Sequence, residues 1–311
     1  MSAGISRNLI NQVSESAIRS AWVQWRSLGA LISAPRPARS IVDPEALVLA
    51  SLALRDRERR LWDVLASWAR TNPRLLSVQR IKNLNSKYPT PTGDRLAEFA
   101  RIAFLEGGDH RWRKLAGTQS GPRPRHQTLQ SPSAEGWDPA ALVVRLRLGL
   151  GVGLQADVLS FLLSQRGAWT SARVVAEATG YTVYAIRRTA DRMAEARLVE
   201  STSGKPIEYR TDSGVWGTVL GIKGQVLPWR YWSQTYAFAV DLLTRAGKGE
   251  LQASTRYLLS SSLRDLGEAH RDAVRLNRIA SLDPHQSAGE EYVSAFDQLA
   301  AALADRMDEG A

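Results

Sequence analysis

The sequence contains no cysteine and only four histidines. Without thiols the chain can form no disulfide framework, no cysteine-ligated zinc or iron–sulfur site and no thiol nucleophile. The histidines show no metal-ligand spacing, and no phosphate-binding loop or serine-hydrolase motif occurs. We therefore predict a protein that is not an enzyme, with no catalytic residue, no metal and no cofactor.

Long apolar runs are also missing. The longest candidate, Leu142–Leu150, is interrupted by Arg145 and Arg147, and the segment Met1–Asn11 is polar. Neither stretch resembles a membrane-spanning helix or a secretory signal. We expect no membrane association and a cytoplasmic location.

The positive charge that is present is unevenly distributed. The net charge is +10, of which residues 1–117 carry +9, whereas residues 213–311 carry −2. A basic excess in one part of a chain suits a polyanionic partner such as nucleic acid. A general preference for arginine over lysine would explain the residue type but not this asymmetry.

The segment from Leu154 to Asp212 carries the clearest pattern. Apolar residues recur at helical spacing in three stretches, and two short β-prone runs around Gly204-Lys205-Pro206 follow them. Ser171 (or Thr170) and Thr182 precede the second and third helices as hydroxyl N-caps, and Gly180 can take the positive φ of the turn between them. The predicted elements are helices Leu154–Arg166, Ala172–Ala178 and Val183–Arg197 and strands Leu198–Ser201 and Ile207–Arg210.

This order of elements, over residues 138–212, resembles the winged helix-turn-helix of bacterial transcriptional regulators of the MarR and ArsR kind. The resemblance implies that the helix Val183–Arg197 enters the major groove while the hairpin contacts phosphates. An inner apolar stripe would comprise Val183, Ile186, Ala190 and Met193. The predicted DNA-binding residues are Ser171, Thr182, Tyr184, Arg187, Arg188, Arg192, Lys205 and Arg210. The plainer interpretation is a solvated face whose arginines pair with Asp191 and Glu195.

The flanking parts are predicted to be helical. Residues 1–117 would form a basic helical domain that starts with a helix over residues 1–33, and residues 118–137, rich in Gly, Pro and Ser, a flexible linker. Residues 213–311 would form a C-terminal helical domain. In it, Val215–Leu227 has β-like character and Trp229–Leu243 is a helix with an aromatic inner face.

Two further hypotheses concern these flanks. Asp43-Pro44 echoes Asp138-Pro139 as a helix start, so residues 43–88 could form a second DNA-reading unit, although a plain basic bundle explains the same pattern. Its additional DNA contacts would be Gln79, Arg80, Lys82, Asn83 and Lys87. In the C-terminal domain, a helical seam predicts a dimer interface made by Tyr292, Phe296, Leu299 and Leu303.

Together these patterns predict a mainly α protein, in which a winged helix-turn-helix with a small β-hairpin lies between N-terminal and C-terminal helical domains. The expected function is a sequence-specific regulator of transcription, a repressor that binds double-stranded DNA as a homodimer. Antitoxins and controllers of phage defence offer analogies for a winged helix on a larger body. The alternatives are a protein-interaction or scaffold protein and, less favoured, a nucleic-acid-processing enzyme.

Overall fold

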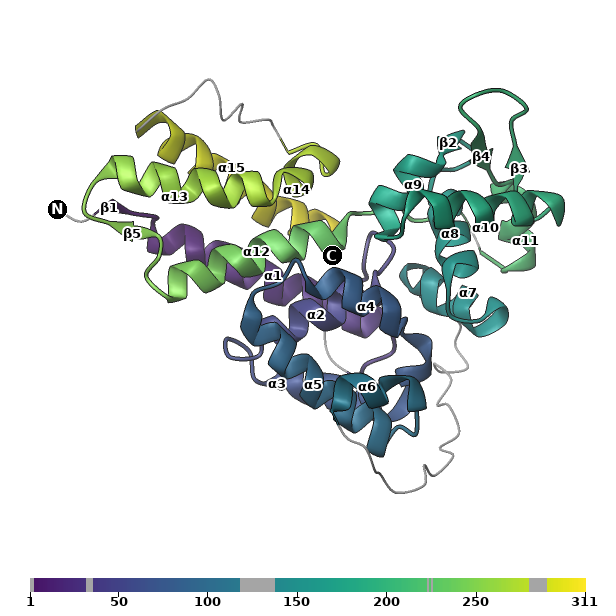
Figure 1. Ribbon diagram of the computed structural model, residues 1–311, viewed down its shortest axis with the longest axis horizontal. Helices are drawn as coiled ribbons and strands as arrows, with labels where there is room; N and C mark the ends of the chain where they lie inside the picture. Colours follow the sequence, from purple (N-terminus) through teal and green to yellow (C-terminus); the bar gives the residue numbers. More distant parts are fainter. Residues whose placement is uncertain (1–2, 32–35, 118–137, 223, 225, 280–289) are drawn as a thin grey trace.

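The computed structural model describes residues 3–31, 36–117, 138–222, 224, 226–279 and 290–311 (Figure 1). The chain is mainly helical, with one small three-stranded antiparallel sheet and a two-stranded pair. The predicted linker, residues 118–137, lies outside the described residues. Within the described ranges no helix combines the length and the apolar composition that a bilayer requires.

Helices from the two ends of the sequence share one hydrophobic core, which we call the body. The N-terminal helices are α1 (Arg7–Ser27), α2 (Pro44–Leu54), α3 (Arg60–Thr71), α4 (Val78–Asn85), α5 (Thr90–Leu105) and α6 (Arg113–Ala116), with 3-10 turns at Pro73–Leu75 and His110–Trp112. The C-terminal helices are α12 (Trp232–Gly247), α13 (Arg256–Ala269), α14 (Arg271–Leu276) and α15 (Glu290–Gly310). Trp25, Phe99, Phe238 and Phe296 are fully buried in one cluster. The prediction that residues 1–117 and 213–311 form separate domains is therefore wrong.

The first helix is shorter than predicted. Strand β1 (Ala3–Gly4) precedes it and pairs antiparallel with β5 (Gln252–Ala253), which ties the start of the body to the segment between α12 and α13. The helix ends at Ser27, and Gly29 follows with a φ of +92°, a conformation that glycine adopts without steric cost. The predicted helix over residues 1–33 is thus interrupted well before the prolines that were expected to end it.

The seam predicted to mediate dimerisation is buried inside the chain itself. Tyr292, Phe296, Leu299 and Leu303 are each at most 5% exposed. Helix α15 carries them against α1 and α13, and α1 and α15 run side by side in Figure 1. An apolar seam indicates that some partner covers it but not which one, and here the partners are helices of the same chain, α1, α12 and α13. The predicted dimer interface is therefore wrong.

Residues 138–222 form a second unit, which we call the central lobe, drawn in teal and green in Figure 1. Its helices are the 3-10 turn Pro139–Ala141, α7 (Leu142–Leu150), α8 (Leu154–Ser164), α9 (Ala172–Thr179), α10 (Val183–Glu195) and α11 (Ser213–Val219). Its strands are β2 (Thr170–Ser171), β3 (Glu200–Ser201) and β4 (Glu208–Arg210). The sheet order is β2-β4-β3, with both pairs antiparallel. Phe161, Ile186 and Tyr209 belong to the core of this lobe.

Helix α11 takes the place of the first part of the segment Val215–Leu227, which was predicted to be β-like. The Asp212 side chain caps it by accepting hydrogen bonds from the backbone N–H groups of Gly214, at 2.8 Å, and Val215, at 3.1 Å. These bonds satisfy donors that have no partner in the first turn of a helix, and they outweigh the weak helical propensity of glycine and valine. Trp216 of this helix donates to the Leu198 carbonyl at 3.1 Å, which holds α11 beside the end of α10.

Candidate nucleic-acid interface

Helices α9 and α10 are joined by the turn that the sequence predicted. Ser171 Oγ accepts from the Val174 N–H at 3.5 Å, and Thr182 Oγ1 accepts from the Ala185 N–H at 3.2 Å. Gly180, between the helices, has a φ of +76°. The predicted N-caps and the positive-φ glycine are confirmed, because each depends only on neighbouring residues.

The two faces of α10 differ in burial. Ile186, Ala190 and Met193 are at most 1% exposed and pack in the lobe core. Val183, predicted to belong to the same stripe, is 41% exposed, so the buried part of the helix begins one turn later. Tyr184 is 75% exposed on the other side.

Three arginines lie on the solvent side of α10. Arg187, Arg188 and Arg192 are exposed, and among the described residues no carboxylate lies within ion-pair distance of any of them. Asp191, which the plainer interpretation paired with them, instead accepts a hydrogen bond from the Tyr209 hydroxyl at 2.6 Å. The ion pairs that the plainer interpretation requires are therefore absent among the described residues, and the positive charge of this face meets solvent.

The hairpin is fixed to α10 by that hydrogen bond from Tyr209. Burial, followed by the hydrogen bond to Asp191, raises the pKa of the Tyr209 phenol above its usual value, so the hydroxyl remains a donor. Strands β3 and β4 consequently cannot slide along the helix without breaking a short, charge-assisted bond.

The two predicted basic contacts on the hairpin differ. Lys205 is exposed at the turn between β3 and β4. Arg210, in contrast, pairs with Glu200 at 2.7 Å across the two strands and lies over the Trp169 ring, 4.5 Å from its centroid. Arg210 therefore stabilises the sheet, and Lys205 is the more accessible cation.

The second predicted set of DNA contacts, on and after α4, is dispersed. Arg80 is only 2% exposed and points into the protein, so its assignment as a DNA contact is wrong. Gln79 and Asn83 bind each other through their side chains at 3.0 Å, and Lys82 is half-buried. Only Lys87 keeps a fully exposed basic side chain, and it lies at a cavity described below.

Arg80 instead belongs to a buried junction between the body and the central lobe. Its guanidinium donates to Asp43 and Glu45, both at 2.6 Å, and to the Thr179 carbonyl at the end of α9. Arg147 of α7 donates to Glu45 at 2.6 Å and to Asp157 of α8 at 2.9 Å. All five charged side chains are at most 2% exposed. The junction thus fixes α7, α8 and the α9 terminus to α2 and α4.

The pKa values of Glu45 and Asp157 in this junction are shifted in opposite directions. Burial disfavours the Glu45 carboxylate, but Arg147, Arg80 and their hydrogen bonds outweigh it and lower the pKa of Glu45 to about 2. Burial raises the pKa of Asp157, and repulsion from Glu45 adds to that effect. Three carboxylates face only two guanidiniums here, so the cations do not offset the effect of burial on the pKa of Asp157.

Two residues of this junction, Asp43 and Arg147, have a different interpretation in the sequence. Asp43 was interpreted as a helix cap, which it also is, since it accepts from the Ala46 N–H at 3.1 Å. In the sequence, Arg147 stands out only as a charge that interrupts the apolar run Leu142–Leu150. A charged residue within a strongly apolar segment is rarely buried without a partner, and this would have been the useful signal.

The part of the chain that the structure describes contains no group of three or more histidine or acidic side chains that could hold a metal ion. No family model, no curated protein and no solved structure matches this chain.

Proposed function

We propose that the protein is a DNA-binding regulator of transcription whose central lobe is a winged helix-turn-helix and whose α10 reads the major groove of double-stranded DNA. The observation that carries the proposal is the solvent face of α10, which bears Arg187, Arg188 and Arg192 without acidic partners among the described residues. Guanidinium groups on an accessible helix suit contacts to guanine edges and phosphates.

The surrounding elements support this role. The helices α8, α9 and α10 are followed by a hairpin, and β4 lies between β2 and β3, which is the order expected of a winged helix. Lys205, exposed at the hairpin turn, would contact a phosphate, and the hydrogen bond from Tyr209 to Asp191 holds the hairpin against α10. The basic N-terminal part of the body would add contacts that do not depend on sequence.

The test is a gel-shift assay on duplexes selected from a random library, with the salt concentration varied. The wild-type protein should lose affinity steeply as salt rises, because bound cations of the DNA are displaced on binding. Arg188→Ala combined with Arg192→Ala should abolish retention, while circular dichroism shows unchanged helical content. Retention equal to that of the wild type would exclude α10 as the reading element.

A matched control removes the same charge elsewhere. Arg60 and Arg271 are exposed, but each is paired with a neighbouring glutamate, Glu58 and Glu268 respectively. Arg60→Ala combined with Arg271→Ala should therefore retain the selected duplex. Equal losses in both double variants would indicate a general charge effect instead of a reading helix.

A second candidate function is protein recognition by the same lobe. Besides Tyr184 and Val183, the neighbouring Trp169 and Val174 are 39% and 38% exposed, so apolar surface accompanies the arginines. Such surface favours a protein partner. A protein-binding lobe would retain no duplex at any salt concentration in the assay above.

A further inference from the structure

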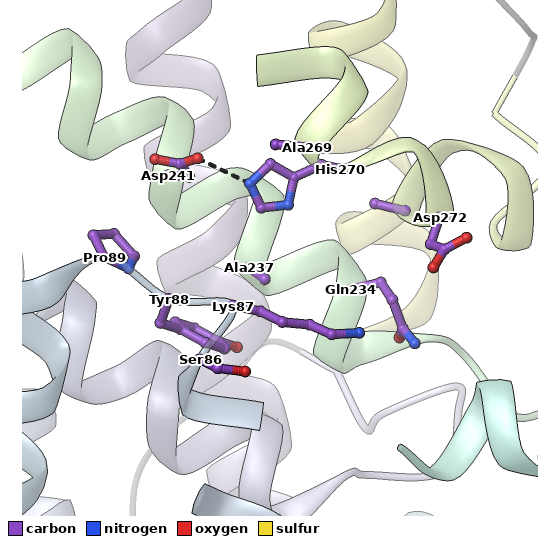
Figure 2. Close-up of a pocket in the computed structure, with 11 residues that line it drawn as sticks. Ser86, Lys87, Tyr88, Pro89, Gln234, Ala237, Asp241, Ala269, His270 and Asp272 are labelled. Atoms are coloured by element: carbon purple, nitrogen blue, oxygen red, sulfur yellow. Dashed lines mark hydrogen bonds and ion pairs between the residues drawn. The ribbon is translucent and has the colours of Figure 1, made fainter. Parts of the chain in front are cut away.

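A cavity of about 420 Å³ lies in the body, between the turn after α4 and the helices α12, α13 and α14 (Figure 2). Its volume falls within the range of small-molecule sites, which is about 300–1,000 Å³. Segments far apart in the sequence form its walls, with Lys87 on one side and His270 on the other. The apolar part of the lining is Pro89, Ala237, Ala269 and Ala273.

His270 is held rigidly in this wall. Its side chain is only 9% exposed, its Nε2 lies 2.9 Å from Asp241 Oδ2, and its ring stacks on Phe238 with centroids 5.4 Å apart. Hydrogen bonds from His270 and Arg245 lower the pKa of Asp241 in spite of its burial, so the carboxylate accepts and Nε2 carries the proton. Among the described residues Nδ1 has no partner, and Figure 2 shows this nitrogen on the ring side away from Asp241.

The charges around the cavity are not balanced. Asp241 pairs with Arg245 at 3.1 Å and accepts a hydrogen bond from His270, and Asp272 pairs with Arg275 at 3.0 Å. The ammonium group of Lys87 has no acidic partner within the described ranges, and Figure 2 shows its side chain extended across the cavity toward Gln234. The cavity lining therefore contains the Lys87 ammonium group, which has no acidic partner among the described residues, and the His270 ring held in a fixed position. Its apolar side chains are those named above.

We propose that this cavity binds a small molecule that carries a carboxylate on a compact apolar body. The carboxylate would pair with Lys87, and the apolar body would cover the alanines and Pro89 beside the His270 ring. This assignment uses the one lysine of the lining, which has no acidic partner among the described residues.

One residue of the cavity lining also contacts the central lobe. Gln234 lines the cavity and donates through Nε2 to the Glu177 carbonyl of α9 at 2.9 Å, while Arg275 of α14 reaches the Glu177 carboxylate at 3.4 Å. A bound molecule that moves Gln234 would thereby move α9. The consequence for DNA binding rests on the proposed function, whereas binding of the small molecule does not.

The test uses the full chain labelled with ¹⁵N-histidine and titrated with benzoate, without DNA, so its outcome is independent of the proposed function. Nuclear magnetic resonance should show a saturable shift of the His270 ring nitrogens, identified by their loss in His270→Gln. Benzamide, which has the same shape but no charge, should produce no saturable shift.

The deciding variant for benzoate binding is Lys87→Met. Lys87 is exposed, so this substitution should leave the fold intact. Loss of a charge-assisted contact should weaken benzoate binding by about tenfold or more. Lys82→Met, a partly exposed lysine of α4 outside the cavity lining, should leave it unchanged. A dissociation constant weaker than about 10 mM for the wild type, or equal binding by Lys87→Met, would overturn the proposal.

Discussion

Arg147 binds two carboxylates and a backbone carbonyl at a position without access to water. Its side chain is fully buried, and it donates to Glu45, to Asp157 and, at 2.9 Å, to the Leu75 carbonyl. These partners come from three separate segments, two of the body and one of the central lobe. Arg147 therefore helps to fix the lobe on the body, together with the bond from Arg80 to the Thr179 carbonyl.

Replacing Arg147 by Met should be strongly destabilising. The substitution leaves Glu45 and Asp157 buried with too few cations, and breaking a buried ion pair on one side costs about 3–5 kcal/mol. Urea denaturation followed by tryptophan fluorescence measures the change. Arg188→Met, exposed and without an acidic partner among the described residues, should stay within about 0.5 kcal/mol of the wild type. Similar small effects of both substitutions would show that the junction contributes little.

The pKa of Glu45 predicts a particular response to acid. Its folded-state pKa of about 2 lies below the ordinary 4.5, so its contribution to stability is complete above pH 4.5 and is lost as the pH falls toward 2. The free energy of unfolding of Glu45→Gln should lie below that of the wild type at neutral pH and converge with it near pH 2. A difference that stays constant across this range would contradict the assignment. Glu195→Gln, at an exposed position, should follow the wild-type curve throughout.

At the scale of single elements, the sequence predicted the features that neighbouring residues determine. The caps of α9 and α10, the turn at Gly180 and the buried stripe from Ile186 onward depend on residues a few positions apart. Arg80 shows where this reasoning stops. Its place on a basic, amide-rich helix suggested DNA, but its carboxylate partners lie more than 30 residues earlier. No local pattern indicates which face of such a helix the body covers.

The hairpin leads to a prediction about salt. Lys205 is exposed at its turn, and a lysine that contacts one phosphate releases about one counterion. Lys205→Ala should weaken binding similarly for all duplexes and reduce the slope of log affinity against log salt by about one. Gel-shift titrations on the selected and on scrambled duplexes measure both quantities. A loss confined to the selected duplex would mean that Lys205 reads a base.

At the scale of the whole molecule, the pairing of α1 with α15 closes the body. Phe296 on α15 is fully buried and lies edge-on to Phe238 of α12, with ring centroids 6.1 Å apart. The seam had suggested a second subunit, because an amphipathic helix does not reveal the sequence distance of its partner. The closed body explains why residues near both ends of the sequence enter one core.

Replacing Phe296 by alanine distinguishes a seam buried within one chain from a seam between two subunits. Phe296→Ala should lower the free energy of unfolding by about 3–5 kcal/mol, as expected for a large buried aromatic group. The mass in solution, measured by light scattering, should equal that of the wild type. A lower mass with unchanged stability would instead place Phe296 between subunits. Tyr257→Ala, at a side chain that is 76% exposed, is the control and should change neither quantity.

The same pairing has a consequence for synthesis on the ribosome. The apolar face of α1 is complete at Ser27, but the helix that covers it begins only at Glu290. Synthesis proceeds at about 5–20 residues per second, so this face of α1 stays uncovered for roughly ten seconds to nearly a minute before α15 is made. During this interval the side of α1 that packs against α15 is open to other molecules, so we expect recovery of the native protein to depend on chaperones that hold unfinished chains.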